Sequence, residues 1–144
     1  MNIFIASDFN NFARCMMIRT RVFVIEQNIA ANLETDEFEN TSTHYLVGNG
    51  EGFIATARSR FLEDKETAKI ERVAVLKEAR GKGVGRQLMD YILNDLYTSP
   101  HLKTIKLGSQ KTAIGFYQKL GFQVIGEEYI DAGIPHHLMM KIVS

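Results

Sequence analysis

The chain's apolar positions follow two different periods, which predict the order of its helices and strands. Short apolar or alternating runs bounded by turn residues predict strands at residues 2–6, 43–47, 52–61, 67–76, 103–107, 122–129 and 137–143. Helical spacing predicts a helix after an N-cap at Ser7 or Asp8, with Phe12, Ala13, Met16 and Met17 on its apolar side, and further helices at residues 84–97 and 111–120. The order β-α-(α)-β-β-β-α-β-α-β-β predicts an α/β (α+β) protein with a mixed sheet of about six or seven strands.

Turn residues and polar stretches mark the connections between these elements. The sequence GNGEG at residues 48–52 predicts a tight antiparallel hairpin, and Gly121 is placed to end the last helix in a left-handed conformation. The run RVFVIEQ at residues 21–27 fits either a helix or a strand. Residues 28–42 are polar and aperiodic, which predicts a loop with the composition of a mobile segment.

Length and composition narrow the possible functions. The 144 residues predict one domain, and 17 basic against 17 acidic residues argue against a nucleic-acid binder that works through a broad basic field. The first residues lack a signal-peptide pattern and no window reaches the ~20 apolar residues of a membrane span, so we expect a cytoplasmic protein. Cys15 is the one cysteine, which excludes an internal disulfide and predicts a small core residue.

Three glycines at alternate positions stand out in EARGKGVGRQLM, residues 78–89, where a predicted strand gives way to a helix. The N–H groups of a first helical turn lack partners, and glycines let an anion reach them. A P-loop is excluded because no Gly-Lys-Ser/Thr follows at the required offset. A dinucleotide-binding fingerprint is excluded because Arg86 and Leu88 occupy the positions of its third glycine.

The pattern R-x-x-G-x-G that begins at Arg80, after the strand sequence IERVAVL, resembles the pyrophosphate-binding motif of the GNAT superfamily of acetyl-CoA-dependent N-acetyltransferases. AIGFYQKLGF at residues 113–122 resembles a later segment of the same family. RVFVIEQ, Asp36, His44, LGSQ at residues 107–110 and EEYIDAGIPHHLMMK at residues 127–141 are similar to the small ElaA-like bacterial branch.

This resemblance implies a cleft between two splayed parallel strands, with the thioester of acetyl-CoA between Leu76 and residues 105–109. Gly83 and Gly85 are expected to let the pyrophosphate approach closely, and Gly81 to help the turn. The implied cofactor-binding residues are Val73, Ala74, Val75, Arg80, Gly81, Lys82, Gly83, Val84, Gly85, Arg86, Gln110 and Phe116.

Two side chains are candidates for proton transfer. The resemblance implies that Tyr117 protonates the leaving thiolate, although an aromatic at this helical spacing also fits a core residue. Glu71 is the candidate general base, and alternation predicts that it shares a face with Val73 and Val75, opposite Arg72. A salt-bridged strand residue and a water relay remain alternatives for the base.

The acceptor is a small-molecule or peptide amine that the sequence does not identify. His44, Arg58 and His136 are candidates for lining its site, with a solvated basic stripe as the alternative for Arg58 and Arg60. The adjacent His136 and His137 point to opposite faces of a strand, so no metal site is expected. A non-catalytic acyl-CoA-binding sensor or scaffold, an unrelated nucleotide-phosphate binder and a homodimer all remain compatible with the sequence.

Overall fold

The computed structural model describes residues 1–143, whose strands form one seven-stranded sheet in the order β1-β2-β3-β4-β5-β7-β6. All neighbouring strands are antiparallel except β4 and β5, which are parallel. The strands are β1 (Asn2–Ile5), β2 (Thr43–Gly48), β3 (Phe53–Phe61), β4 (Thr67–Val75), β5 (Thr104–Gln110), β6 (Gln123–Asp131) and β7 (Ile134–Ile142). The predicted mixed sheet is confirmed.

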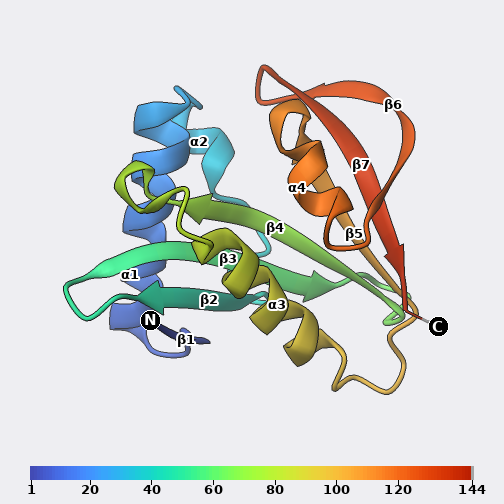
Figure 1. Cartoon of the computed structure of the whole chain (residues 1–144), viewed down its shortest axis with the longest axis horizontal. Coiled ribbons are helices and arrows are strands. Elements are labelled where there is room, and N and C mark those ends of the chain that lie inside the picture. The colour runs from blue at the N-terminus through green and yellow to red at the C-terminus, as the bar shows by residue number, and fades with distance from the viewer. Residues whose placement is uncertain (144) are drawn as a thin grey trace.

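Helices cover both faces of the sheet (Figure 1). They are α1 (Phe9–Arg19), the π-helix η1 (Thr20–Glu26), α2 (Ala31–Glu34), the 3-10 turn η2 (Lys77–Ala79), α3 (Val84–Leu96), the 3-10 turn η3 (Lys111–Ala113) and α4 (Ile114–Gln118). In Figure 1, α1 lies behind the sheet and α3 and α4 lie in front of it. No helix among residues 1–143 is long and apolar enough to cross a membrane.

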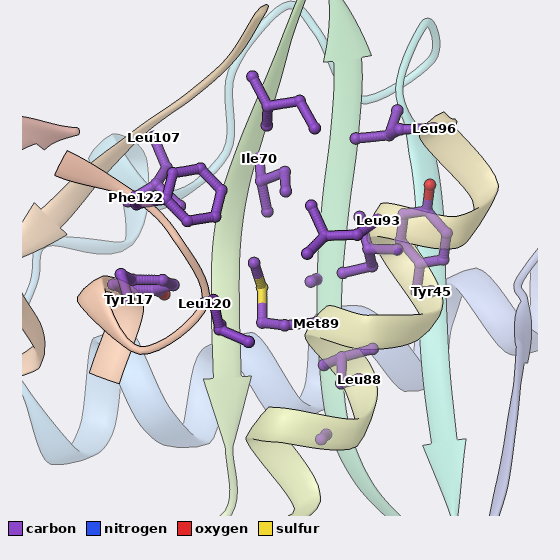
Figure 2. Close-up of a cluster of buried hydrophobic side chains, with 14 of the residues drawn as sticks. Tyr45, Ile70, Leu88, Met89, Leu93, Leu96, Leu107, Tyr117, Leu120 and Phe122 are labelled. Carbon is purple, nitrogen blue, oxygen red and sulfur yellow. The ribbon is translucent and has the colours of Figure 1, made fainter. Parts of the chain in front are cut away.

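Each face of the sheet has its own apolar cluster. The larger cluster packs α3 and the α4 region against the sheet through Leu88, Met89, Ile92 and other buried side chains (Figure 2). The smaller cluster holds α1 and η1 on the opposite face through Cys15, Ile18, Val22 and Phe23. Cys15 is fully buried, as predicted.

The segment from residue 20 to residue 42 differs most from the sequence prediction. The ambiguous run at 21–27 forms the π-helix η1, in which Gln27 N–H donates to Val22 O, five residues earlier, at 3.0 Å. Residues 31–34 form the helical turn α2, and Glu34 is buried against Arg19. The prediction of a loop is therefore wrong at residues 31–34, where a helical turn places Glu34 against Arg19.

Candidate active site

The paired strands β4 and β5 separate part of the way along the sheet. Their parallel pairing ends at Ile70 and Leu107, although β4 continues to Val75 and β5 to Gln110. Beyond that point β4 still pairs with β3, and β5 still pairs with β7. The sheet therefore opens in its middle, with backbone groups along the edge of β4 left without a β5 partner.

A β-bulge at Arg72 changes which side chains point to which face of β4. Arg72 has a φ of 57°, and the pairing register with β3 shifts there. Glu71 consequently shares a face with Arg58, while Val73 and Val75 pack on the opposite face, toward α3. The prediction that Glu71 shares a face with the two valines is wrong, because simple alternation fails across a bulge.

A cavity of about 700 Å³ occupies the opening and is lined from both faces of the sheet. It brings together these sequence-predicted residues: Glu71, Val73, Ala74, Val75, Arg80, Gly81, Gly83, Val84, Gly85, Arg86, Gln110, Phe116, Tyr117 and His136. It also includes residues to which the sequence assigned no individual role in the site, namely Gln27, Glu34, Arg72, Gly108, Tyr129 and Asp131. Lys82, His44 and Arg58 do not line it.

The glycine stretch forms a turn that ends at the N-terminus of α3. Gly81 and Gly83 both have positive φ, 77° and 80°, and no atom lies within 4 Å of the position of a side-chain carbon at either residue. Gln87 N–H donates to Gly83 O as the first bond of the helix, so the N–H groups of residues 84–86 have no intrahelical acceptor. These donors and the helix dipole suit an anion.

Gly85 lies in a closely packed position. A side-chain carbon there would lie 3.4 Å from Phe116 Cζ and 3.8 Å from Val75 Cγ2. The missing side chain of Gly85 therefore lets α3 pack closely against Phe116 and β4.

The basic side chains of the glycine stretch already have partners within the chain. Arg80 binds both carboxylate oxygens of Glu26 at 2.6 and 2.7 Å, and its Nε donates to Val75 O at 3.0 Å. Arg86 lies 3.6 Å from Asp90, and Lys82 Nζ lies 3.4 Å from Glu78 O. Arg80 is therefore fully engaged, whereas Lys82, Arg86 and the backbone N–H groups keep donors for a ligand.

Tyr117 lies between the cavity and the larger apolar cluster (Figure 2). Its ring makes edge contacts with Phe116 and Phe122 at centroid distances of 5.0 and 6.1 Å. Burial raises the pKa of its hydroxyl to about 12. The hydroxyl is therefore protonated at neutral pH and is available as a hydrogen-bond and proton donor.

Arg58 is fully buried and forms ion pairs with three carboxylates. Its guanidinium lies 2.6 Å from Asp36 and 2.8 Å from Glu39, and 3.0 Å from Glu71. Both expectations for Arg58, an acceptor-binding residue and a solvated stripe, are therefore wrong. The sequence correctly predicted the face of β3 on which the Arg58 side chain lies. It did not show that the segment around Asp36 covers that face.

Glu71 is held by the same network. Its Oε1 accepts from Arg58 and, at 2.8 Å, from Arg60 Nε. Burial alone would raise the pKa of Glu71, but the hydrogen bond from Arg60 and the charge of Arg58 outweigh burial and lower it. These contacts support the salt-bridged alternative, because a carboxylate with a lowered pKa is a weak proton acceptor.

The network makes a prediction for stability at acid pH. The hydrogen bond from Arg58 lowers the pKa of Asp36 from 3.8 to about 2, and for Glu39 the contacts with Arg19 and Arg58 overcome burial and lower the pKa from 4.5 to about 2. Both folded pKa values lie below the unfolded ones, so this stabilisation is complete above about pH 5 and is lost as the pH falls toward 2. Urea unfolding at a series of pH values should show a loss of the order of 2 kcal/mol per carboxyl. Asp36→Asn should make the free energy of unfolding depend less steeply on pH. An unchanged slope would mean that Asp36 does not contribute to the acid sensitivity.

The hairpin of β6 and β7 forms the wall opposite β4. His136 lines the cavity, stacked on Tyr129 with ring centroids 5.8 Å apart. His44 is instead buried beside α1, with Nε2 2.8 Å from Glu39 O, so its expected place in the acceptor site is wrong. Among residues 1–143 no group of His, Cys, Asp and Glu side chains is arranged to hold a metal ion.

Comparisons with known proteins agree with this geometry. The family model described as "Acetyltransferase (GNAT) domain" matches residues 19–143. An uncharacterized N-acetyltransferase of Bacillus subtilis, YjcF, is 38% identical over 142 residues, which cover 98% of this chain and 99% of that protein.

Solved structures show the same fold. Escherichia coli ElaA superimposes with a TM-score of 0.87 at 29% identity and covers 97% of this chain and 98% of its own. An aminoglycoside 6'-N-acetyltransferase complexed with coenzyme A has a TM-score of 0.77 at 15% identity, covering 99% and 97% of the two chains, and shows the fold alone. The chain therefore belongs to the GNAT family of N-acetyltransferases.

Proposed function

We propose that this protein transfers the acetyl group of acetyl-CoA directly to a primary amine. The observation that carries the proposal is the opening between β4 and β5, which has an anion-binding helix N-terminus at one end and the Tyr117 hydroxyl in its wall. Acyl transfer to an amine needs a bound thioester, access for the amine and a proton for the departing thiolate. The opening is lined by residues from both faces of the sheet, which suits two substrates that approach from opposite sides.

The residues of the chain fit acetyl-CoA. The free N–H groups of residues 84–86 and the open space at Gly81 and Gly83 suit a pyrophosphate. The edge of β4 beyond Ile70 offers backbone groups at Val73 and Val75 to a pantetheine arm. Phe116 lies half-buried beside Gly85, where it supports that arm.

In this mechanism Tyr117 supplies the proton for the thiolate. Glu71 keeps Arg58 and Arg60 in place and thereby fixes the bulge at the opening, a positioning role in place of the general base considered from sequence. The acceptor belongs to the small-molecule or peptide amines, and its identity is to be found by experiment.

Two measurements test the proposal. CoA release is followed with a panel of amines that includes a polyamine, an amino sugar, an aminoglycoside and a short peptide. Thermal unfolding is recorded with acetyl-CoA, ATP or NAD, and acetyl-CoA at 100 times its Kd should add ~2.7 kcal/mol of stability. Stabilisation by ATP or NAD instead would overturn the proposal, and tight acetyl-CoA binding without turnover on any amine would favour a non-catalytic acyl-CoA sensor.

Gly83→Val should weaken acetyl-CoA binding by about ten- to hundredfold, because a branched side chain at the helix N-terminus blocks one or two N–H bonds to phosphate. The matched control is Gly50→Val in the hairpin between β2 and β3. Gly50 has a φ of 90° and the same open surroundings, so both variants carry similar backbone strain. Calorimetric titration of each folded variant with acetyl-CoA measures the difference, and equal affinities would make the glycine turn a purely structural feature.

A further inference from the structure

The acceptor amine must lose a proton, and the side chains on its side of the opening differ in their ability to accept one. Glu71 is held by arginines, which makes it a weak acceptor. Glu34 is buried in an ion pair with Arg19. A neutral imidazole is a better acceptor at neutral pH than a carboxylate held by guanidinium groups.

The ring of His136 is oriented by a backbone contact. Its Nδ1 lies 2.7 Å from Ile134 O, and a carbonyl oxygen only accepts, so Nδ1 carries the proton. In the neutral ring Nε2 then holds the lone pair. Within residues 1–143 Nε2 has no recorded hydrogen-bond or ion-pair partner, and the half-buried ring lines the cavity.

Tyr129 places this ring beside the point where the strands separate. The rings of Tyr129 and His136 are stacked, with an angle of 28° between their planes. The Tyr129 hydroxyl lies against Gly108, so closely that a side-chain carbon at position 108 would collide with it. Gly108 directly follows Leu107, the last residue of β5 that pairs with β4.

His136 and Tyr117 lie on opposite faces of the sheet. His136 is paired with Gln110, and these residues point away from the cluster that contains Leu107 and Met139. Tyr117 belongs to that cluster and approaches the opening from the side of α3 and α4. A proton donor and a proton acceptor therefore lie on opposite sides of the same opening.

We propose that His136 Nε2 is the general base that takes the proton from the attacking amine. This inference rests on the proposed acetyl transfer. The neutral amine nitrogen forms a bond to the thioester carbonyl carbon and gives one proton to Nε2. The carbon–sulfur bond then breaks, the sulfur takes the proton of the Tyr117 hydroxyl, and solvent returns a proton to Tyr117 and removes one from His136.

The cavity that His136 lines also holds several charged or titratable groups. They are Tyr129 and Asp131 from β6, Lys69, Glu71 and Arg72 from β4, and Glu34 from α2. Lys69 and Arg72 are within reach of carboxylates, at 3.7 Å from Glu71 and 3.4 Å from Asp36. Their charges are thus partly compensated.

His136→Asn tests the assignment, because the asparagine amide can keep the bond to Ile134 O but offers no basic nitrogen. The kcat with an amine that turns over in the panel should fall about 10²- to 10⁴-fold, while the Kd of acetyl-CoA stays unchanged. The acidic limb of the kcat/KM profile should disappear, and imidazole added to the buffer should restore part of the rate. The control is His137→Asn, the adjacent histidine on the opposite face of β7, which does not line the cavity.

The outcomes separate this inference from the function on which it rests. If the wild-type protein releases no CoA with any amine, the acetyl transfer and the role of His136 both fail. If the wild-type protein turns over and His136→Asn loses less than about tenfold in kcat, or keeps the acidic limb, the transfer stands and His136 is not the base. His136→Gln provides a second variant should the asparagine protein fail to fold.

Discussion

Replacing Tyr117 by phenylalanine is expected to lower kcat for acetyl transfer about 10²- to 10⁴-fold, the usual contribution of a positioned acid. The pKa of about 12 keeps the hydroxyl protonated across the working range, so its loss removes the proton for the leaving thiolate. The ring remains packed between Phe116 and Phe122, and the affinity for acetyl-CoA should not change. Steady-state kinetics combined with calorimetric titration separates the two effects.

Tyr97→Phe is the matched control, since Tyr97 lies at the end of α3 with 43% of its surface exposed. It loses the same hydroxyl group far from the opening and should keep full activity. If Tyr117→Phe retains kcat within about tenfold of the wild type, Tyr117 is a core aromatic and solvent supplies the proton.

Arg58→Met should destabilise the protein by about 3–5 kcal/mol, because it leaves Asp36, Glu39 and Glu71 close together without their shared guanidinium. For a chain of this length the loss corresponds to a fall in Tm of roughly 10–15 °C. Calorimetric unfolding at neutral pH measures it. The same variant unfolded at low pH should lose less, because its three carboxylates are then protonated.

Arg21→Met is the matched control for Arg58→Met. Arg21 forms an ion pair with Glu78 whose two side chains are 55% and 58% exposed, a type of contact worth about 0–1 kcal/mol. Arg58→Met combined with Glu71→Gln should recover part of the lost stability, since one buried charge is removed. Equal Tm values for Arg58→Met and the wild type would mean that the buried network contributes no net stability.

The elements with strong hydrophobic periodicity could be predicted from the sequence. So could the conformation of the glycine turn, because it depends on local backbone preferences. Helix α3 follows the predicted spacing, and Gly81 and Gly83 have the positive φ that was expected of the turn at its start. Both features are set by residues close together in the chain. Tyr117 lines the same cavity because only the short turn η3 separates β5 from α4.

The errors arose where distant segments decide the outcome. Strand alternation assigned Glu71 to the wrong face because a bulge at Arg72 leaves no clear mark in the sequence. Arg58 was assigned to a solvated stripe because nothing local shows that three carboxylates close over it. The roles of Tyr129 and His136 depend on how the β6–β7 hairpin lies against β5, which is again a tertiary property.

The ion pairs beside the glycine turn limit the distance over which this turn attracts an anionic ligand. Arg80 is neutralised by Glu26 and Arg86 lies near Asp90, so of the three basic side chains of the turn Lys82, whose contact is with the carbonyl oxygen of Glu78, keeps an uncompensated charge. Opposite charges side by side cancel each other's field within a few ångströms, and salt screens what remains. Recognition at this turn is consequently mostly short-ranged: the charge of Lys82 is the part that acts at a distance, and the helix N-terminus selects phosphate groups once they arrive.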